Sequence, residues 1–196
     1  MNRGDITELH FITAIENVPS ILEHGILSNR RAAGLAHRSV AMLEVQDRRR
    51  DKRIPGAGLL HEYANLYFDA HNPMLSRRRD MNDSICVLRV DASVLDQPGV
   101  IVADRNAASD YVRFYAASAG IQALDKDLIF AQFWTNADDP YEAMRHKSIK
   151  CAEVLVPDSV SPDLLIGAYV ANQRALGAFE ALGTQLPVVI NGAMFF

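Results

Sequence analysis

Short apolar runs, most of them bounded by polar or turn-forming residues, dominate the hydrophobic pattern of the chain. They are rich in β-branched and aromatic residues, as expected of strands that pack on a core. Because strands and helices do not alternate regularly, the pattern favours an α+β fold over a doubly wound parallel sheet. The predicted strands lie at residues 9–14, 63–68, 85–90, 99–102, 150–157, 166–170 and 187–190.

Helical signals are fewer than strand signals. After the first strand, Asn17 is placed to cap a helix, Pro19 suits its first turn and Gly25 suits its end. Two long segments lack any apolar period and are expected to be irregular, surface-exposed and functional or mobile. Further helices are predicted at 109–119, 127–134 and 172–182, and the segments without a period are 27–58 and 141–150.

Composition limits the domain count and the kind of partner. The chain has 196 residues, of which 49% are hydrophobic and 22% charged, and no Ser/Gly/Pro-rich linker divides it. We therefore expect one domain over 1–196 with a real core. The net charge of −4 excludes a protein that binds nucleic acid through an overall basic surface, so any such contact requires a local patch.

The cysteines and the N-terminus indicate the compartment. Cys86 and Cys151 lie in apolar runs, which is typical of buried thiols in a reducing environment rather than of a disulfide framework. Residues 1–5 lack the apolar core of a secretory signal, and no apolar run approaches membrane-spanning length. No Cys or His pair has a metal-ligand spacing. The expectation is a cytoplasmic protein without a metal or a membrane contact.

One carboxylate stands out among the apolar runs. Glu153 lies in a predicted inner strand beside the β-branched Val154 and Val156, and Pro157 ends the run. A carboxylate on such a strand faces solvent, pairs with a cation or takes part in chemistry, because its burial without a partner is costly. The strand alone favours the exposed position, so Glu153 becomes a functional candidate only with support from elsewhere.

The densest charge lies in the segment 46–53. A solvated surface run is the ordinary interpretation, and two acids within the run weaken its field. Against this, arginine captures phosphate bidentately, and the nearby Gly56 and Gly58 let a backbone approach a ligand closely. The basic side chains are Arg48, Arg49, Arg50, Lys52 and Arg53, and a second basic run occupies 77–79.

Aromatic and histidine side chains give weaker signals. Tyr67 and Phe68 either pack in the core or stack on a planar ring, and core packing is favoured for each alone. The six histidines are scattered without ligand spacing. His10 has more weight than the others because it lies in the first predicted strand.

Several blocks in one order resemble a known family. From about residue 9 to 157, and more weakly beyond, the chain resembles the DarT family of DNA ADP-ribosyltransferase toxins, which are paired with a macrodomain antitoxin, DarG. The blocks that carry the resemblance are 10–26, 39–41, 46–49, 54–55, 60–63, 66–68, 72–75 and 152–156.

The resemblance implies an ADP-ribosyltransferase fold with two small facing antiparallel sheets around a split NAD cleft and added helices. It implies NAD⁺ as co-substrate, single-stranded DNA as acceptor and a DarG-like macrodomain antitoxin as partner. Glu153 would be the catalytic carboxylate, and Arg49 would contact the phosphates of NAD⁺ and the target base. The expected donor contacts are His10, Phe11, Thr13, Asn17, Gln46, Tyr67 and Met74, and the expected DNA contacts are Arg48, Arg50, Arg53, Arg145, His146 and Lys147.

The first block departs from the pattern His-Phe/Ile-Thr-His, which is usual among the relatives that modify DNA thymidine. Alignment on Thr13 and Asn17 puts Phe11 where the first histidine belongs, so His10 is one residue out of register. On a strand this shift turns a side chain to the opposite face. Either a bulge brings His10 inward, or the NAD⁺ contact is made differently. The departure also leaves both guanine and thymine open as the acceptor base.

Two other functions remain open from the sequence. The same chemistry on RNA or protein is compatible with the net charge of −4. A catalytically silent nucleic-acid-binding module with this fold is the alternative from a different class. A monomer is the expected oligomeric state.

Overall fold

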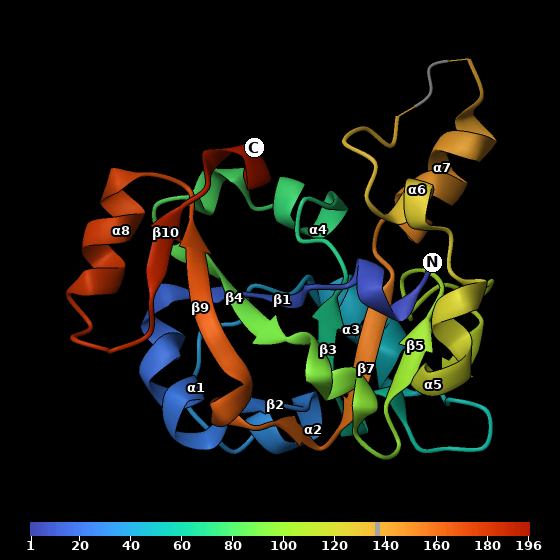
Figure 1. Ribbon diagram of the computed structural model, residues 1–196, viewed down its shortest axis with the longest axis horizontal. Helices are drawn as coiled ribbons and strands as arrows, with labels where there is room; N and C mark the ends of the chain where they lie inside the picture. Colours follow the sequence, from blue (N-terminus) through green and yellow to red (C-terminus); the bar gives the residue numbers. More distant parts are fainter. Residues whose placement is uncertain (136–137) are drawn as a thin grey trace.

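Eight strands form one sheet in the computed structural model, which describes residues 1–135 and 138–196 (Figure 1). Their order is β10-β9-β4-β1-β3-β7-β5-β6, and β2 and β8 form a separate two-stranded sheet. The strands are β1 (Glu8–Ala14), β2 (Ile26–Leu27), β3 (Tyr63–Tyr67), β4 (Ile85–Asp91), β5 (Ile101–Ala103), β6 (Phe114–Ala116), β7 (Glu153–Pro157), β8 (Ser159–Val160), β9 (Leu165–Val170) and β10 (Val188–Ile190).

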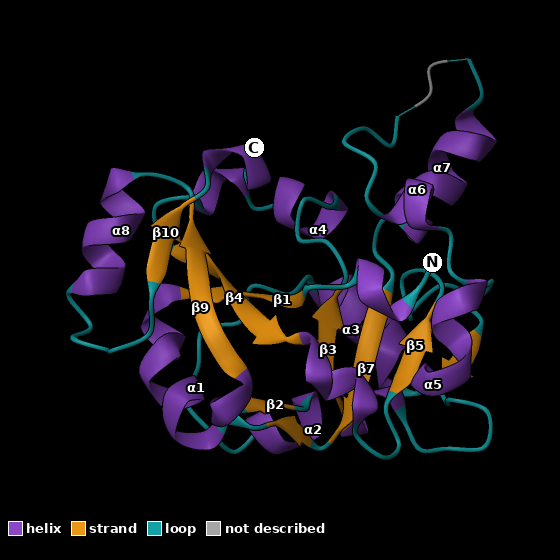
Figure 2. Ribbon diagram, viewed as in Figure 1, coloured by secondary structure: helices purple, strands orange, loops and turns teal. Residues whose placement is uncertain are grey.

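Short helices surround the sheet, and α6 and α7 form an arm that projects away from it (Figure 2). The α-helices are α1 (Val18–His24), α2 (Asn29–Ala32), α3 (Leu43–Arg50), α4 (Pro73–Ser76), α5 (Ala117–Gly120), α6 (Lys126–Ile129), α7 (Pro140–Ile149) and α8 (Gln173–Glu180). The 3-10 helices are η1 (Arg3–Asp5), η2 (Ile15–Asn17), η3 (Leu60–Glu62), η4 (Arg79–Met81), η5 (Ala92–Asp96), η6 (Ile121–Ala123), η7 (Pro162–Leu164) and η8 (Gly192–Met194).

The α+β fold is confirmed, and each predicted strand is present within a few residues of its expected limits. The reason is clearest in β4, which lies between β9 and β1 and is buried on both faces for most of its length. A strand in that position has a continuous apolar run rather than an alternating one. The pairing is antiparallel except between β9 and β10, which are parallel.

The two sheets expected from the resemblance are halves of one sheet. β1 pairs with β4 along its full length, from Glu8 opposite Asp91 to Ala14 opposite Ile85. With β3, in contrast, β1 shares a single pair, His10 opposite Tyr67. The half-sheets β10-β9-β4-β1 and β3-β7-β5-β6 therefore meet at one point and diverge on either side of it.

Two helix predictions need correction. The segment 109–119 was expected to be helical, but Phe114–Ala116 is the edge strand β6, and the helix begins only at Ala117. Pairing of β6 with β5 outweighs the helical spacing of the aromatic residues. The helix expected over 127–134 is the single turn α6, which is capped by the Asp125 carboxylate and ends at Ile129.

Two segments expected to be irregular contain helices. In α3 the only buried residue is Arg49, and in α7 it is Ile149, so neither helix has an apolar stripe for the sequence pattern to reveal. The start of α7 was nonetheless readable. The Asp139 carboxylate accepts hydrogen bonds from the first-turn amides, and Pro140 occupies the first turn.

Both cysteines are buried free thiols, as predicted. Burial raises the pKa of Cys151 to about 12, and it raises the pKa of Cys86 still further, so both stay protonated. Among the described residues, no helix is both long and apolar enough to cross a bilayer. In the same residues, no three His, Cys, Asp or Glu side chains are grouped as metal ligands.

Candidate active site

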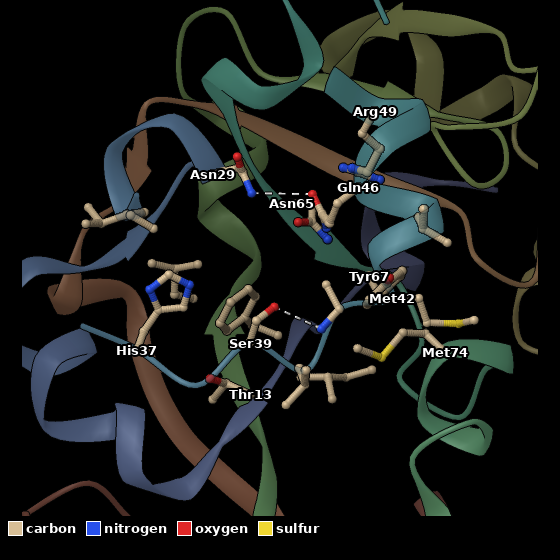
Figure 3. A pocket seen from close by; sticks show the side chains of 18 of the residues that line it. Thr13, Asn29, His37, Ser39, Met42, Gln46, Arg49, Asn65, Tyr67 and Met74 are labelled. Carbon is tan, nitrogen blue, oxygen red and sulfur yellow. Dashed lines mark hydrogen bonds between the residues drawn. The ribbon is translucent and has the colours of Figure 1, made fainter. Parts of the chain in front are cut away.

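A pocket of about 440 Å³ opens where the half-sheets diverge (Figure 3). Phe11 and Thr13 of β1 and Asn65 and Tyr67 of β3 contribute to its walls. Helices α3, α4 and α7 supply further lining residues. The segment 35–42, which we call the strap, covers another side of the pocket. The pocket thus brings together residues from most of the blocks that carried the family resemblance.

A buried ion pair forms the floor of this region. The Glu153 side chain is 1% exposed and the Arg49 side chain 7%. Arg49 Nη1 donates to both carboxylate oxygens of Glu153 and Nη2 donates to Oε2, each at 3.0 Å. The amide of Ala107 donates to Glu153 Oε1 at 2.9 Å. Of the three possibilities for Glu153, the structure therefore excludes the exposed position and shows pairing with a cation.

The strand register places Glu153 against the pocket wall. Glu153 opens β7 and lies opposite Tyr67 on β3 and Ala103 on β5, so the three side chains share one face of the sheet. Burial, together with the negative charge of Glu153, raises the pKa of Tyr67 well above its ordinary value. Tyr67 therefore stays a neutral phenol beside the ion pair. Arg49 itself lines the pocket and lies between the open space and the carboxylate.

Tyr67 and Met74 both line the pocket, and both also pack against the cluster of buried residues that includes Ile12 and Val87. Both side chains therefore pack against the core and also face the pocket. Met74 is positioned by Asn72, whose Oδ1 accepts hydrogen bonds from the first amides of α4. Phe68, in contrast, is 1% exposed and belongs to the core.

Gln46 lines the pocket within a polar network that the sequence did not reveal. Its Oε1 accepts a hydrogen bond from Asn29 Nδ2 at 3.4 Å and lies 3.1 Å from His61 Nε2. Burial and then the nearby charges of Arg49 and Arg50 lower the pKa of His61, so the neutral ring donates from Nε2. Asn29 comes from the segment 27–58, which has no periodic pattern, and His61 is one of the scattered histidines, so neither indicated this contact in the sequence.

Asn17 holds the strap in place. Its Nδ2 donates to Thr13 Oγ1 at 3.2 Å and to the carbonyl of Arg38 at 2.8 Å, and its Oδ1 accepts from the amide of Arg38 at 2.9 Å. Asn17 occupies the N-cap position of α1, but its side chain makes no capping hydrogen bond. A second anchor comes from Arg78, whose Nε donates to the carbonyl of Val40 at 2.7 Å.

His10 does not reach the pocket. The register between β1 and β4 is continuous, so no bulge turns His10 inward, and Phe11 and Thr13 line the pocket instead. His10 Nδ1 accepts from the amide of Ala70 at 3.2 Å, and its Nε2 lies 3.1 Å from Glu8 Oε1. His10 is not among the lining residues, and the geometry thus gives no support to the predicted donor contact by His10.

Glu8 completes the group around His10. Partial burial opposes its ionisation, but hydrogen bonds from His10 and Arg89 outweigh it and lower the pKa of Glu8 to about 2. Arg89 Nε donates to Glu8 Oε2 at 2.8 Å, and its guanidinium lies 4.8 Å from the ring centre of Tyr169. These contacts tie β1, β4 and β9 together, which makes the His10 group structural.

The predicted DNA contacts divide into two sets. Arg48 and Lys147 line the pocket. The other four lie outside it and are engaged locally. Arg50 pairs with Asp47 at 2.7 Å, Arg145 pairs with Glu142 at 3.0 Å, His146 Nε2 lies 3.0 Å from the carbonyl of Leu128, and the backbone of Arg53 bridges to Leu59.

Lys150 is a buried cation that the sequence did not single out. Its side chain is fully buried, and its Nζ donates to the carboxylate of Asp69 and, at 2.8 Å, to the carbonyl of Ile129. Asp69 follows β3, Ile129 ends α6 and Lys150 directly follows α7. This contact therefore fixes the α6–α7 arm to the sheet three residues before Glu153.

Known proteins share this sequence and architecture. A protein-family model described as "ssDNA thymidine ADP-ribosyltransferase, DarT" matches residues 10–196. A "DNA ADP-ribosyl transferase-DNA ADP-ribosyl glycohydrolase fusion protein" of Thermosipho africanus (strain H17ap60334) is 30% identical over 202 residues, which cover 96% of this chain and 49% of that protein. The chain thus spans about half the length of this relative.

A shorter relative and a solved structure match most of both lengths. A "DNA ADP-ribosyl transferase" of Thermus sp. (strain 2.9) is 30% identical over 179 residues, covering 86% of this chain and 83% of that protein. The solved structure "Thermus sp. 2.9 DarT in complex with ADP-ribosylated ssDNA" superimposes with a TM-score of 0.82 at 25% identity, covering 98% of this chain and 97% of that one.

Proposed function

Because the chain belongs to the DarT family of single-stranded-DNA ADP-ribosyltransferases, we propose that it transfers ADP-ribose from NAD⁺ to a base in single-stranded DNA and releases nicotinamide. The observation that carries this proposal is the buried Glu153 carboxylate, which is held by Arg49, a residue that lines the pocket. The family description names thymidine, so thymine is the proposed base and guanine the alternative.

The proposed reaction depends on the positive charge that develops on the ribose. Breaking the bond between nicotinamide and ribose leaves a cationic, oxocarbenium-like ribose, and the bond electrons depart with neutral nicotinamide. A fixed carboxylate at this point stabilises the developing positive charge. A nitrogen of the target base then bonds to the ribose carbon, and Glu153 accepts the proton that this nitrogen loses. Neither step requires a metal.

Arg49 has two roles in this proposal. Without a ligand it neutralises Glu153, which would otherwise be a buried charge without a partner. Because it also lines the pocket, it meets the donor pyrophosphate when NAD⁺ enters. Tyr67 and Met74 supply a neutral ring and a polarizable side chain for the nicotinamide and the base.

The other predicted donor contacts keep their proposed roles according to their position. Phe11, Thr13, Asn17 and Gln46 line the pocket and are proposed to surround NAD⁺. His10 is left out of the donor site because its side chain is bound to Glu8 and Ala70. These donor contacts then come from β1, η2 and α3.

The proposal also covers the domain organisation, the oligomeric state, the compartment and the partner of the protein. Residues 1–196 act as one ADP-ribosyltransferase domain, monomeric and cytoplasmic, and its toxicity is countered by a DarG-like macrodomain antitoxin that removes ADP-ribose. The fusion of transferase and glycohydrolase in the Thermosipho relative supports such a partner.

Mass spectrometry tests the proposed reaction. The protein is incubated with NAD⁺ and, separately, with mixed-sequence single-stranded DNA, RNA of the same sequence and a protein extract. An ADP-ribose mass on the DNA is expected, and fragmentation identifies the base. Addition only to RNA or protein would favour the alternative acceptor, whereas DNA binding without any addition would indicate a silent binding module.

The hydrogen bonds between Asn17 and the strap lead to a testable prediction. The Asn17→Ala variant loses the side-chain hydrogen bonds that hold Arg38, each worth about 1 kcal/mol, and is expected to raise KM for NAD⁺ about fivefold to thirtyfold. KM for DNA should change less. Steady-state kinetics with each substrate varied in turn measures both. Ser20→Ala, at another lining residue near the start of α1, serves as the control. Equal KM values in Asn17→Ala and the control would contradict the anchoring role.

A further inference from the structure

The pocket is positively charged although the protein is acidic. Five arginine or lysine side chains line it, against one carboxylate, that of Glu44. The net charge of the whole chain is −4. A concave site lined by one sign of charge concentrates counter-ions of the opposite sign. The lining therefore selects a polyanionic ligand despite the overall charge. The five cations are Arg38, Arg48, Arg49, Arg77 and Lys147.

These cations differ in what they already bind. Arg49 is committed to Glu153, Arg38 lies 3.7 Å from the carboxylate of Glu16, and Arg48 Nε donates to a backbone carbonyl in its own helix. Within the described parts of the chain, the side chains of Arg77 and Lys147 have no hydrogen bond or ion pair. Both are exposed at the pocket. They are the lining cations whose whole side chain has no partner among the described residues.

Arg77 and Lys147 belong to different elements that line the pocket. Arg77 directly follows α4, which carries Met74, and Lys147 lies near the end of α7, which leads into Cys151. Met74 and Cys151 both line the pocket, and Glu153 follows two residues after Cys151. The two free cations thus flank the part of the pocket that leads to the catalytic carboxylate. The remaining cations belong to the strap and α3.

We propose that Arg77 and Lys147 bind backbone phosphates of the acceptor strand on either side of the target nucleotide, so that the strand crosses the pocket between α4 and α7. This inference rests on the proposed function and adds Arg77, which no earlier argument assigned, to the DNA contacts. Phosphate contacts of this kind position a strand without specifying its sequence. A single strand held at two points presents its base to the pocket without the cost of extrusion from a duplex.

The neighbours of Arg77 make it a specific choice within its basic run. Arg78 is occupied by the carbonyl of Val40. Arg79 is exposed but does not line the pocket. The run 77–79 therefore contains one strap anchor, one surface charge and one candidate phosphate ligand. Arg79→Ala is a matched control for Arg77→Ala, because both remove an exposed guanidinium from the same short segment.

The experiment measures binding of a fluorescent single-stranded oligonucleotide by anisotropy over a range of salt concentrations. Arg77→Ala is expected to weaken binding about tenfold at low salt. It should also reduce the slope of log K against log salt by about 0.7, the value for one phosphate contact on a single strand. KM for DNA should rise in parallel while KM for NAD⁺ stays unchanged, and Arg79→Ala should behave as the original protein.

A chemical counterpart uses a neutral methylphosphonate linkage next to the target nucleotide. It should weaken binding to the original protein but not add to the effect of Arg77→Ala, because both changes remove the same contact. An effect of Arg77→Ala on KM for NAD⁺ alone, or equal effects of Arg77→Ala and Arg79→Ala, would overturn the proposed strand path. If the proposed function itself were wrong, the result would be different, because the unaltered protein would then not modify DNA at all.

Discussion

The Glu153→Gln variant should transfer ADP-ribose with a kcat lower by about 10³-fold or more, equivalent to about 4 kcal/mol of transition-state stabilisation. Glutamine keeps the shape of the side chain but removes the negative charge that, in the proposed mechanism, stabilises the cationic ribose. It also cannot accept the proton from the attacking base. Steady-state transfer measured by oligonucleotide mass, with NAD⁺ consumption followed in parallel, gives the ratio directly. Transfer within tenfold of the original rate would contradict a catalytic role for Glu153.

A loss of folding must be separated from this loss of activity. Glu153→Gln leaves the buried Arg49 without a counter-charge, and breaking a buried ion pair costs about 3–5 kcal/mol. The double variant Arg49→Met with Glu153→Gln removes both charges and should recover much of that stability. It should remain inactive. Thermal unfolding of the single and double variants, set beside their rates, distinguishes the chemical effect from the structural one.

A comparably large effect on stability is expected from Lys150→Met. Methionine fits the apolar surroundings of the lysine side chain but leaves the carboxylate of Asp69 and the carbonyl of Ile129 without their donor. The free energy of unfolding should fall by about 3–5 kcal/mol. For a chain of this size that corresponds to a decrease in Tm of about 6–20 °C. Calorimetry or circular dichroism measures the change.

Two controls make the Lys150 result interpretable. Lys126→Met breaks the exposed pair with Asp5, in which the lysine side chain is 51% exposed, and should cost less than about 1 kcal/mol. The double variant Lys150→Met with Asp69→Asn should be more stable than Lys150→Met alone, because no unpaired charge remains. If Lys150→Met and Lys126→Met have the same Tm, the contact does not hold the α6–α7 arm.

The sequence predicted the strands of this fold better than its helices, for a physical reason. Strands such as β4 bury nearly every residue, so burial leaves a continuous apolar run in the sequence. Helices α3 and α7 bury one residue each, Arg49 and Ile149, and leave no period. Their stability comes from contacts with distant segments, and such contacts are not encoded in a local pattern.

The site was predictable in part. Glu153 stood out because a carboxylate among apolar residues requires an explanation, and the family resemblance connected it with Arg49. The pairing itself joins residues 104 positions apart and depends on the fold. Asn29 and Lys150 lie in segments without a pattern, and His61 is one of the scattered histidines. Only their position in the structure gives these three residues a role. His10 shows the opposite case, since a conspicuous residue one position out of register lies away from the pocket.

The single residue pair between β1 and β3 has a consequence for how the molecule responds to its ligand. Within the described residues, His10 and Tyr67 form the one backbone pair between the half-sheets, although side chains of both belong to one hydrophobic core, so backbone pairing contributes little at this boundary. A donor molecule bound between them acts as a removable cross-link and stabilises only the assembled state. At a concentration 100 times its Kd, such a ligand adds about 2.7 kcal/mol to the free energy of unfolding. The supply of NAD⁺ in the cell would thereby set how long the folded enzyme persists as well as how fast it works.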